Sequence, residues 1–210
     1  MARGGAPGRR RADAFRAVDE NRGETVSDIP AESNIPAEEV FDIVDNNGRV
    51  IGRAPRSACH GDPSLAHRVV HIHVFNSAGD LLLQKRGKNK TIQPGKWDTS
   101  VGGHLAAGEG YDEAAAREFE EELGVDPACL AGGALLPIYD HVWRNEIETE
   151  HIRVFRLDCE GPFRFQRSEI DAVRFWAEAE IEAALGGGSL TPLFERGWAL
   201  YKEWRSRPRT

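Results

Sequence analysis

The chain has 210 residues, with 27 Lys and Arg against 34 Asp and Glu, and a formal net charge of −7. This length favours one main domain, and the 40% of apolar residues can supply its core. No apolar run approaches the roughly 18 residues of a membrane span, the first residues lack the apolar stretch of a signal peptide, and the acidic balance argues against general nucleic-acid binding.

The three cysteines bear on the cellular setting. They lie far apart and form no CxxC pair, so their spacing indicates neither a disulfide framework nor a cysteine zinc site. We therefore expect a reducing, cytoplasmic setting.

The chain divides into an arm and a domain. Few large apolar side chains occur in residues 1–39, which predicts a flexible N-terminal arm. Apolar and polar residues alternate over residues 40–54 around a turn at 46–48, which predicts a β-hairpin. We expect the domain to span residues 40–205 and a short tail to occupy residues 206–210.

The remaining elements mix strands with helices. A helix is predicted over residues 113–123 because apolar residues recur every four positions from Ala115 to Leu123. Asp112 is its expected N-cap, and Gly124 is expected to end it. Further strands are predicted at 68–76, 81–86, 135–141, 151–157 and 172–176. Further helices are predicted at 178–185 and from Thr191-Pro192 onward, with Pro192 at the first helical position. This mixture predicts an α/β or α+β fold with one core.

One run of acidic residues stands out. Glu118, Glu121 and Glu122 are spaced i, i+3 and i+4, so their carboxylates share one face of the expected helix. A solvated acidic face is the plain interpretation of such a run. Three like charges with Arg117 as the nearest base would also suit a hard divalent cation, which prefers oxygen ligands.

The surrounding segment decides between these interpretations. Residues 103–125 match the pattern G-x5-E-x7-R-E-apolar-x-E-E-x-G-apolar at every defined position, and so resemble the box of the Nudix family. The resemblance implies an α/β/α sandwich with a mixed β-sheet between helices. It also implies hydrolysis of a diphosphate bond with Mg²⁺ or Mn²⁺. By the same resemblance, the ligands are Glu118, Glu121, Glu122 and the carbonyl of Gly102, and Arg117 orients the glutamates.

A narrower resemblance covers most of residues 40–205. Segments such as HRVVHIHVFNSAGDLLLQKRGKNKTIQPGKWDTSVGGH are similar to type I isopentenyl-diphosphate isomerase and its hydrolytic relatives. This implies a second metal, Mn²⁺ or Zn²⁺, on His60, His67, His104, Glu148 and Glu150. It also implies diphosphate binding by Arg86, Lys90 and Arg56. Each residue has a plainer alternative, such as a polar sheet face for His67, His71 and His73, or a solvated loop for the bases.

Two departures favour hydrolysis over isomerisation. Gly102 stands where the isomerase has a catalytic cysteine, and Leu193 stands where it has a tryptophan suited to a carbocation. We therefore expect a hydrolase acting on a nucleoside diphosphate or another X-linked diphosphate. The alternatives are an isomerase-like enzyme and a non-catalytic ligand sensor.

The substrate itself stays open at this stage. Trp97 and Trp143 could stack on a base, cover a prenyl chain or pack in the core. The expected partner is a small diphosphate molecule, with no membrane, and a homodimer is left open.

Overall fold

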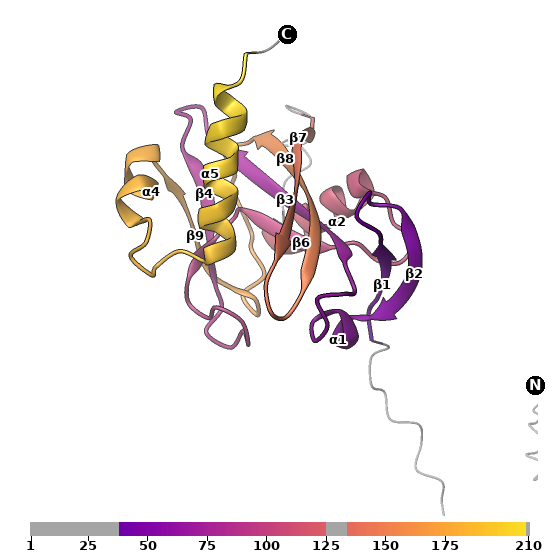
Figure 1. The fold of residues 1–210 in the computed structure, drawn as a ribbon. Coiled ribbons are helices and arrows are strands. Elements are labelled where there is room, and N and C mark those ends of the chain that lie inside the picture. Colours follow the sequence, from indigo (N-terminus) through magenta and orange to yellow (C-terminus); the bar gives the residue numbers. More distant parts are fainter. Residues whose placement is uncertain (1–37, 125–133, 209–210) are drawn as a thin grey trace, which may run out of the picture. The chain divides into compact units, whose positions relative to one another are not determined.

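A computed structural model describes residues 38–124 and 134–208, so most of the predicted arm lies outside the described residues (Figure 1). The predicted first hairpin is confirmed, because β1 (Val40–Val44) and β2 (Val50–Pro55) pair antiparallel. The Asp45 carboxylate closes their turn by accepting N–H bonds from Asn47 and Arg49. The sequence pattern did not predict the single turn of helix that follows, α1 (Arg56–Cys59).

Strand β3 (His67–Phe75) is the centre of the sheet. It pairs antiparallel with β1, β4 and β6 and parallel with β8, which makes the sheet mixed. The other strands are β4 (Leu81–Arg86), β5 (Trp97–Asp98), β6 (Val101–His104), β7 (Leu136–Arg144), β8 (Thr149–Asp158) and β9 (Ile170–Trp176). The predicted strands are therefore confirmed, with ends that differ by a few residues.

Helix α2 (Tyr111–Leu123) covers one face of β3. Its apolar stripe of Ala115, Phe119 and Leu123 is fully buried, as the spacing predicted. The prediction of Asp112 as the N-cap is wrong, because the helix begins two residues earlier than expected. Gly110 is the N-cap, and the Glu113 carboxylate accepts a hydrogen bond from its N–H at 3.0 Å.

Gly124 ends this helix, as predicted. Its φ of 54° lies in the left-handed region, which glycine adopts without the penalty that a side chain brings. Asp112 instead lies in the first turn, where a negative charge suits the positive end of the helix dipole.

Helices α4 (Glu178–Ala184) and α5 (Pro192–Ser206) pack on a second cluster that includes Phe75 of β3. The helix α5 begins at Pro192, as predicted, and the Thr191 hydroxyl caps it by accepting a hydrogen bond from the N–H of Phe194 at 3.1 Å. Phe194, Trp198 and Tyr201 form the buried stripe of α5. The result is an α+β fold in which helices pack on a mixed sheet (Figure 1). No helix in the described ranges is long and apolar enough to cross a membrane.

Cys59, the last residue of α1, is buried and its thiol is free.

The histidines of β3 do not form a solvated polar face. His67, His71 and His73 are all buried, because their face of β3 looks toward α5 and a cavity rather than toward water. Burial above all, with the positive charges of His141 and Arg156, lowers the pKa of His73 to about 3.

Burial of a neutral His73 makes stability depend on pH. An unfolded chain protonates this histidine below about pH 6.5, whereas the folded chain does not, so stability falls as pH falls. We expect His73→Leu to remove about 2 kcal/mol of the stability loss between pH 7 and pH 5. Urea unfolding of both proteins at the two pH values measures this difference, and equal losses would contradict it.

Candidate functional site

A cavity of about 740 Å³ gathers side chains from α2, β4, β6 and β8. Most of the residues singled out in the sequence line it, although they come from distant parts of the chain. The predicted site residues in its wall are Arg56, His60, Arg86, Lys90, Gly102, His104, Arg117, Glu118, Glu121, Glu122, Glu148 and Glu150. His67 does not line the cavity and is fully buried behind it.

Glu118 reaches the cavity across β6. Its carboxylate lies so close to Gly103 that a Cβ at that glycine would overlap it. The glycine at the start of the box therefore makes room for a glutamate 15 positions further along the chain.

Arg117 holds several acidic groups in place. Its Nε and Nη2 atoms donate to the two carboxylate oxygens of Glu109 at 2.8 and 2.9 Å. Its Nη1 donates to Glu118 at 2.8 Å and to Glu121 at 3.2 Å, and its Nη2 also donates to the His104 carbonyl at 3.0 Å. Arg117 therefore contacts three carboxylates of the box at once.

Glu122 is the most deeply buried glutamate of the box. Its Oε2 accepts hydrogen bonds from the side chain of Gln84 at 3.1 Å and from the N–H of Gly102 at 3.4 Å. Burial, followed by the charge of Glu118, raises the Glu122 pKa to about 8. Burial also raises the pKa of Glu118, although Arg117 opposes this effect.

Among the described residues, Glu122 forms no ion pair and Glu118 pairs with Arg117 alone, so a divalent cation would suit these carboxylates. However, the carboxylate oxygens of Glu118, Glu121 and Glu122 are not close enough together to ligate one cation as they stand. The groups of metal-ligating atoms within 4.8 Å of one another, among the described residues, do not include Glu118, Glu121 and Glu122 together. Glu121 instead pairs with Arg117, so ligation of one cation by all three glutamates requires side-chain movement.

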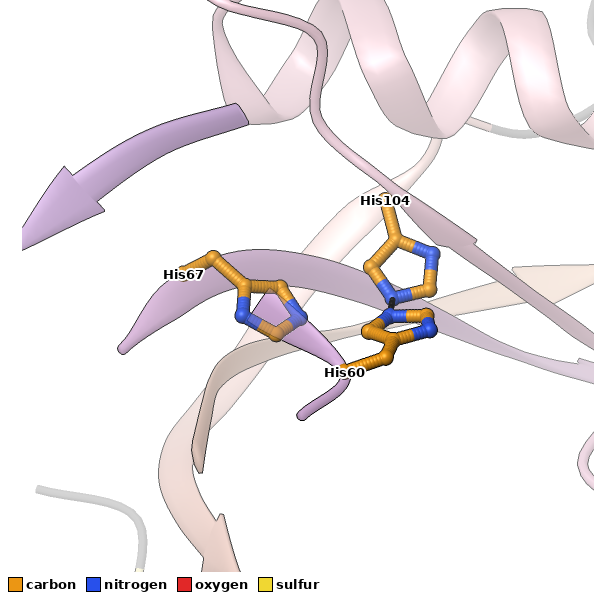
Figure 2. A group of neighbouring side chains, drawn as sticks. All are labelled: His60, His67 and His104. Carbon is orange, nitrogen blue, oxygen red and sulfur yellow. Dashed lines mark hydrogen bonds between the residues drawn. The ribbon is translucent and has the colours of Figure 1, made fainter. Parts of the chain in front are cut away.

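Three histidines do form such a group (Figure 2). His60 follows α1, His67 begins β3 and His104 ends β6, so strand pairing brings distant residues together. The Nε2 atoms of His60 and His104 lie 3.1 Å apart. Phe41 of β1 stacks on His104 with ring centres 4.8 Å apart and planes at 4°, which supports the cluster from the side.

Two acidic residues complete this cluster. His67 pairs with Glu150 in the parallel β3–β8 register, and His67, Glu148 and Glu150 form a second group within 4.8 Å. The Nε2 atom of His60 lies 3.6 Å from Oε2 of Glu148, and the Nε2 atom of His104 lies 3.7 Å from Oε1 of Glu150.

Unsatisfied atoms show what the cluster lacks. Nε2 of His67 and Oε2 of Glu150 are buried without a hydrogen-bond partner in the described part of the chain. Burial lowers the pKa of all three histidines and raises the Glu150 pKa to about 8. Neutral imidazoles and orphaned buried atoms fit a bound cation of the Mn²⁺ or Zn²⁺ kind.

The predicted substrate-binding bases line the cavity with partners of their own. Lys90 donates to Glu169 at 2.6 Å, and Arg56 donates to Glu39 at 2.7 Å. Arg86 donates to Asp98 at 3.3 Å. These pairs hold each base at the cavity wall.

Sequence reasoning missed several polar residues at the cavity. Gln84 and Asp98 face each other across the β4–β5 register, and Asp98 also accepts a hydrogen bond from the Thr191 hydroxyl. Glu169 is a further carboxylate there. A buried polar residue in an apolar strand, as Gln84 is in LLLQKR, was the one available signal.

The tryptophans divide between the core and the cavity. Trp97 is partly buried and packs against the core, with its ring centre 5.3 Å from that of Trp176. Trp143 and Leu193 line the cavity and contact the same small apolar cluster.

This fold places a helix with the run Arg-Glu-x-x-Glu-Glu against a cavity that also holds basic side chains, an arrangement suited to phosphate compounds and cations. The family model described as NUDIX domain matches residues 65–194, which is more than half of the chain. The chain therefore belongs to the Nudix hydrolase family.

Known relatives carry two kinds of name. An uncharacterized Nudix hydrolase of Streptomyces coelicolor is 33% identical over 80% of this chain and 91% of its own length. An isopentenyl-diphosphate Delta-isomerase of Streptomyces avermitilis is 36% identical over 71% of this chain and 77% of its own length.

Solved structures support the fold. DR0079 from Deinococcus radiodurans superimposes with a TM-score of 0.64 at 26% identity, covering 78% of this chain and 99% of that one. A MutT protein from Methanosarcina mazei has a TM-score of 0.55 at 21% identity, with 70% and 98% covered, which supports the fold alone.

Proposed function

We propose that this protein hydrolyses a diphosphate bond in a small X-linked diphosphate molecule, with Mg²⁺ or Mn²⁺ as cofactor. The observation that carries the proposal is the placement of Glu118, Glu121 and Glu122 at one cavity with Arg86 and Lys90. Acidic groups there would hold cations, and basic groups would bind phosphate oxygens.

The residues suggest a division of labour. A cation held by the three glutamates and the Gly102 carbonyl would offset charge on the diphosphate and lower the pKa of water. Arg86, Lys90 and Arg56 bind and orient the phosphates. Glu118 accepts the proton of the attacking water, because burial raises its pKa toward the range of a general base. One P–O bond forms to water oxygen as the bridging P–O bond breaks.

Isomerisation is the second candidate, because relatives named isopentenyl-diphosphate Delta-isomerase match this chain. That reaction needs an acid and a base on either side of a carbon skeleton. Gly102 offers no side chain for this role, and the one free cysteine described, Cys59, is buried and does not line the cavity. These features favour hydrolysis.

A substrate panel tests the proposal. Purified protein with Mg²⁺ or Mn²⁺ is given nucleotide, nucleotide-sugar, dinucleotide and prenyl diphosphates, and release of phosphate or monophosphate is followed. In parallel, isopentenyl diphosphate is incubated in D₂O. We expect phosphate release from at least one compound, whereas deuterium uptake at carbon without phosphate release would overturn the proposal.

A second cation is proposed at the histidine cluster. We expect His60→Gln to lower bound Mn²⁺ from two ions per chain to one, because His60 lies 3.1 Å from His104 and 3.6 Å from Glu148. Isothermal titration with Mn²⁺ measures the stoichiometry. His151→Gln is the matched control, because this histidine belongs to neither ligand group. An unchanged stoichiometry in His60→Gln would refute the second site.

A further inference from the structure

Asp42 of β1 is a buried carboxylate with three partners that come from different elements. Its side chain accepts hydrogen bonds from Arg53 at 3.0 Å, from Arg68 at 2.8 Å and from the N–H of Gly108 at 2.8 Å. The side chains of Asp42 and Arg68 are 4% and 14% exposed, so water screens this pair little, whereas the Arg53 side chain is 64% exposed and its pair is more screened. Such charge-assisted hydrogen bonds are the strong class in proteins.

The bond to Gly108 ties β1 to the loop that joins β6 and α2. Residues 105–109 of this loop make two further anchoring bonds, from Ala107 N–H to the Val40 carbonyl at 2.9 Å and from Leu105 N–H to the Arg68 carbonyl at 3.1 Å. Gly108 has φ of +86°, so the loop is bent at the point where Asp42 holds it. β1 therefore holds this loop in place through the hydrogen bonds of Asp42 and Val40.

This loop contains Glu109, whose carboxylate binds the guanidinium group of Arg117. Both oxygens of Glu109 accept hydrogen bonds from Arg117, and Oε2 also accepts one from the N–H of Ala106 within the loop. Arg117 in turn contacts Glu118 and Glu121. A continuous set of hydrogen bonds thus runs from Asp42 through the loop to the glutamates at the cavity.

We propose that Asp42 is a positioning residue: it holds the 105–109 loop so that Glu109 directs Arg117 toward Glu118. Asp42 lies outside the cavity wall and acts through other residues. Its effect on turnover rests on the proposed function, whereas its effect on Arg117 does not.

The first test reads the position of Arg117 without any metal. The Nε–H signal of Arg117 in ¹⁵N NMR is assigned by its loss in Arg117→Lys. We expect Asp42→Asn to shift this signal and to speed its hydrogen exchange about tenfold, because the grip of Glu109 loosens. The matched control is Glu178→Gln, which also removes a carboxylate from an arginine pair, but between α4 and α5. An Arg117 signal that is unchanged in Asp42→Asn would overturn the proposal.

The second test asks whether Asp42 acts through Glu109. Binding of Mn²⁺ alone is followed by electron paramagnetic resonance in the wild type, Asp42→Asn, Glu109→Gln and the double variant. We expect Asp42→Asn to weaken Mn²⁺ binding about tenfold in the wild-type background but less than twofold in the Glu109→Gln background. Equal losses in both backgrounds would mean that Asp42 acts by another route, and would refute the proposal.

Failure of the proposed function can be distinguished from failure of the role proposed for Asp42. If Glu121→Gln does not alter Mn²⁺ binding, the proposed function fails, while the Arg117 signal still decides the role of Asp42. If Asp42→Asn does not fold, Arg53→Gln is used in its place. The Arg53 side chain is 64% exposed, and its substitution removes one of the hydrogen bonds to Asp42. We expect a smaller change in the Arg117 signal in the same direction, and no change would overturn the proposal.

Discussion

Glu121→Gln is expected to lower kcat at least a hundredfold while the protein stays folded. The Glu121 side chain is 56% exposed, and within the described part of the chain it forms an ion pair with Arg117 alone, so the fold depends little on it. As a proposed cation ligand, it would contribute about 2.7 kcal/mol or more to the reaction, which corresponds to that loss. Turnover of the best substrate from the panel, together with thermal unfolding, measures both effects.

The neighbouring glutamate supplies a matched control. Glu120 belongs to the same acidic run, but it is exposed and does not line the cavity. Glu120→Gln removes the same charge and is expected to change kcat less than twofold. If the two variants had equal activity, Glu121 would not be a ligand and the acidic run would be a solvated helix face.

Gly103→Ala is expected to reduce kcat by a similar factor for a steric reason. The added methyl group would overlap the Glu118 carboxylate, so Glu118 must leave the position in which Arg117 holds it. Because α2 keeps its buried stripe of Ala115, Phe119 and Leu123, we expect the helix to remain packed. Activity and Mn²⁺ affinity, compared with thermal unfolding, separate the loss of Glu118 placement from a loss of fold.

A glycine in open space gives the comparison. A Cβ at Gly52 of β2 would meet nothing within 4 Å, so Gly52→Ala is expected to retain activity. Gly103→Ala with wild-type turnover would show that Glu118 does not need its present position. The proposed general base would then have to be sought elsewhere in the cavity.

Local pattern was sufficient for most elements. Helix α2 was predictable because its apolar residues recur every four positions, and Gly124 ends it by a backbone preference of glycine itself. The prediction of the N-cap was wrong because Asp112 and Gly110 both allow a helix to start. The hydrogen bond from the Gly110 N–H to the Glu113 carboxylate decides between them. α1 is a single turn, too short for any periodicity to reveal.

Proximity between distant segments was a matter for tertiary structure. The grouping of the histidines with Glu148 and Glu150 was implied by resemblance alone, since their spacing along the chain does not bring them together. The β3–β8 register pairs His67 with Glu150 and places both beside His104. The sequence assigned no role to Asp42, Gln84 or Glu169, so only strand pairing and loop packing showed what they contact.

The location of the net charge of −7 was likewise determined in part by sequence and in part by tertiary structure. Between Glu109 and Glu122 the sequence has seven acidic residues against Arg117 alone, a sum of −6, so it located most of the net charge without any structure. Glu118, Glu121 and Glu122 of that run line the cavity, whereas Asp112, Glu113 and Glu120 do not. Sequence spacing determined which carboxylates share a helix face, because helical geometry is local. Only the packing of α2 against β6 decided which of them meet a cavity, because that depends on contacts between segments far apart in the chain.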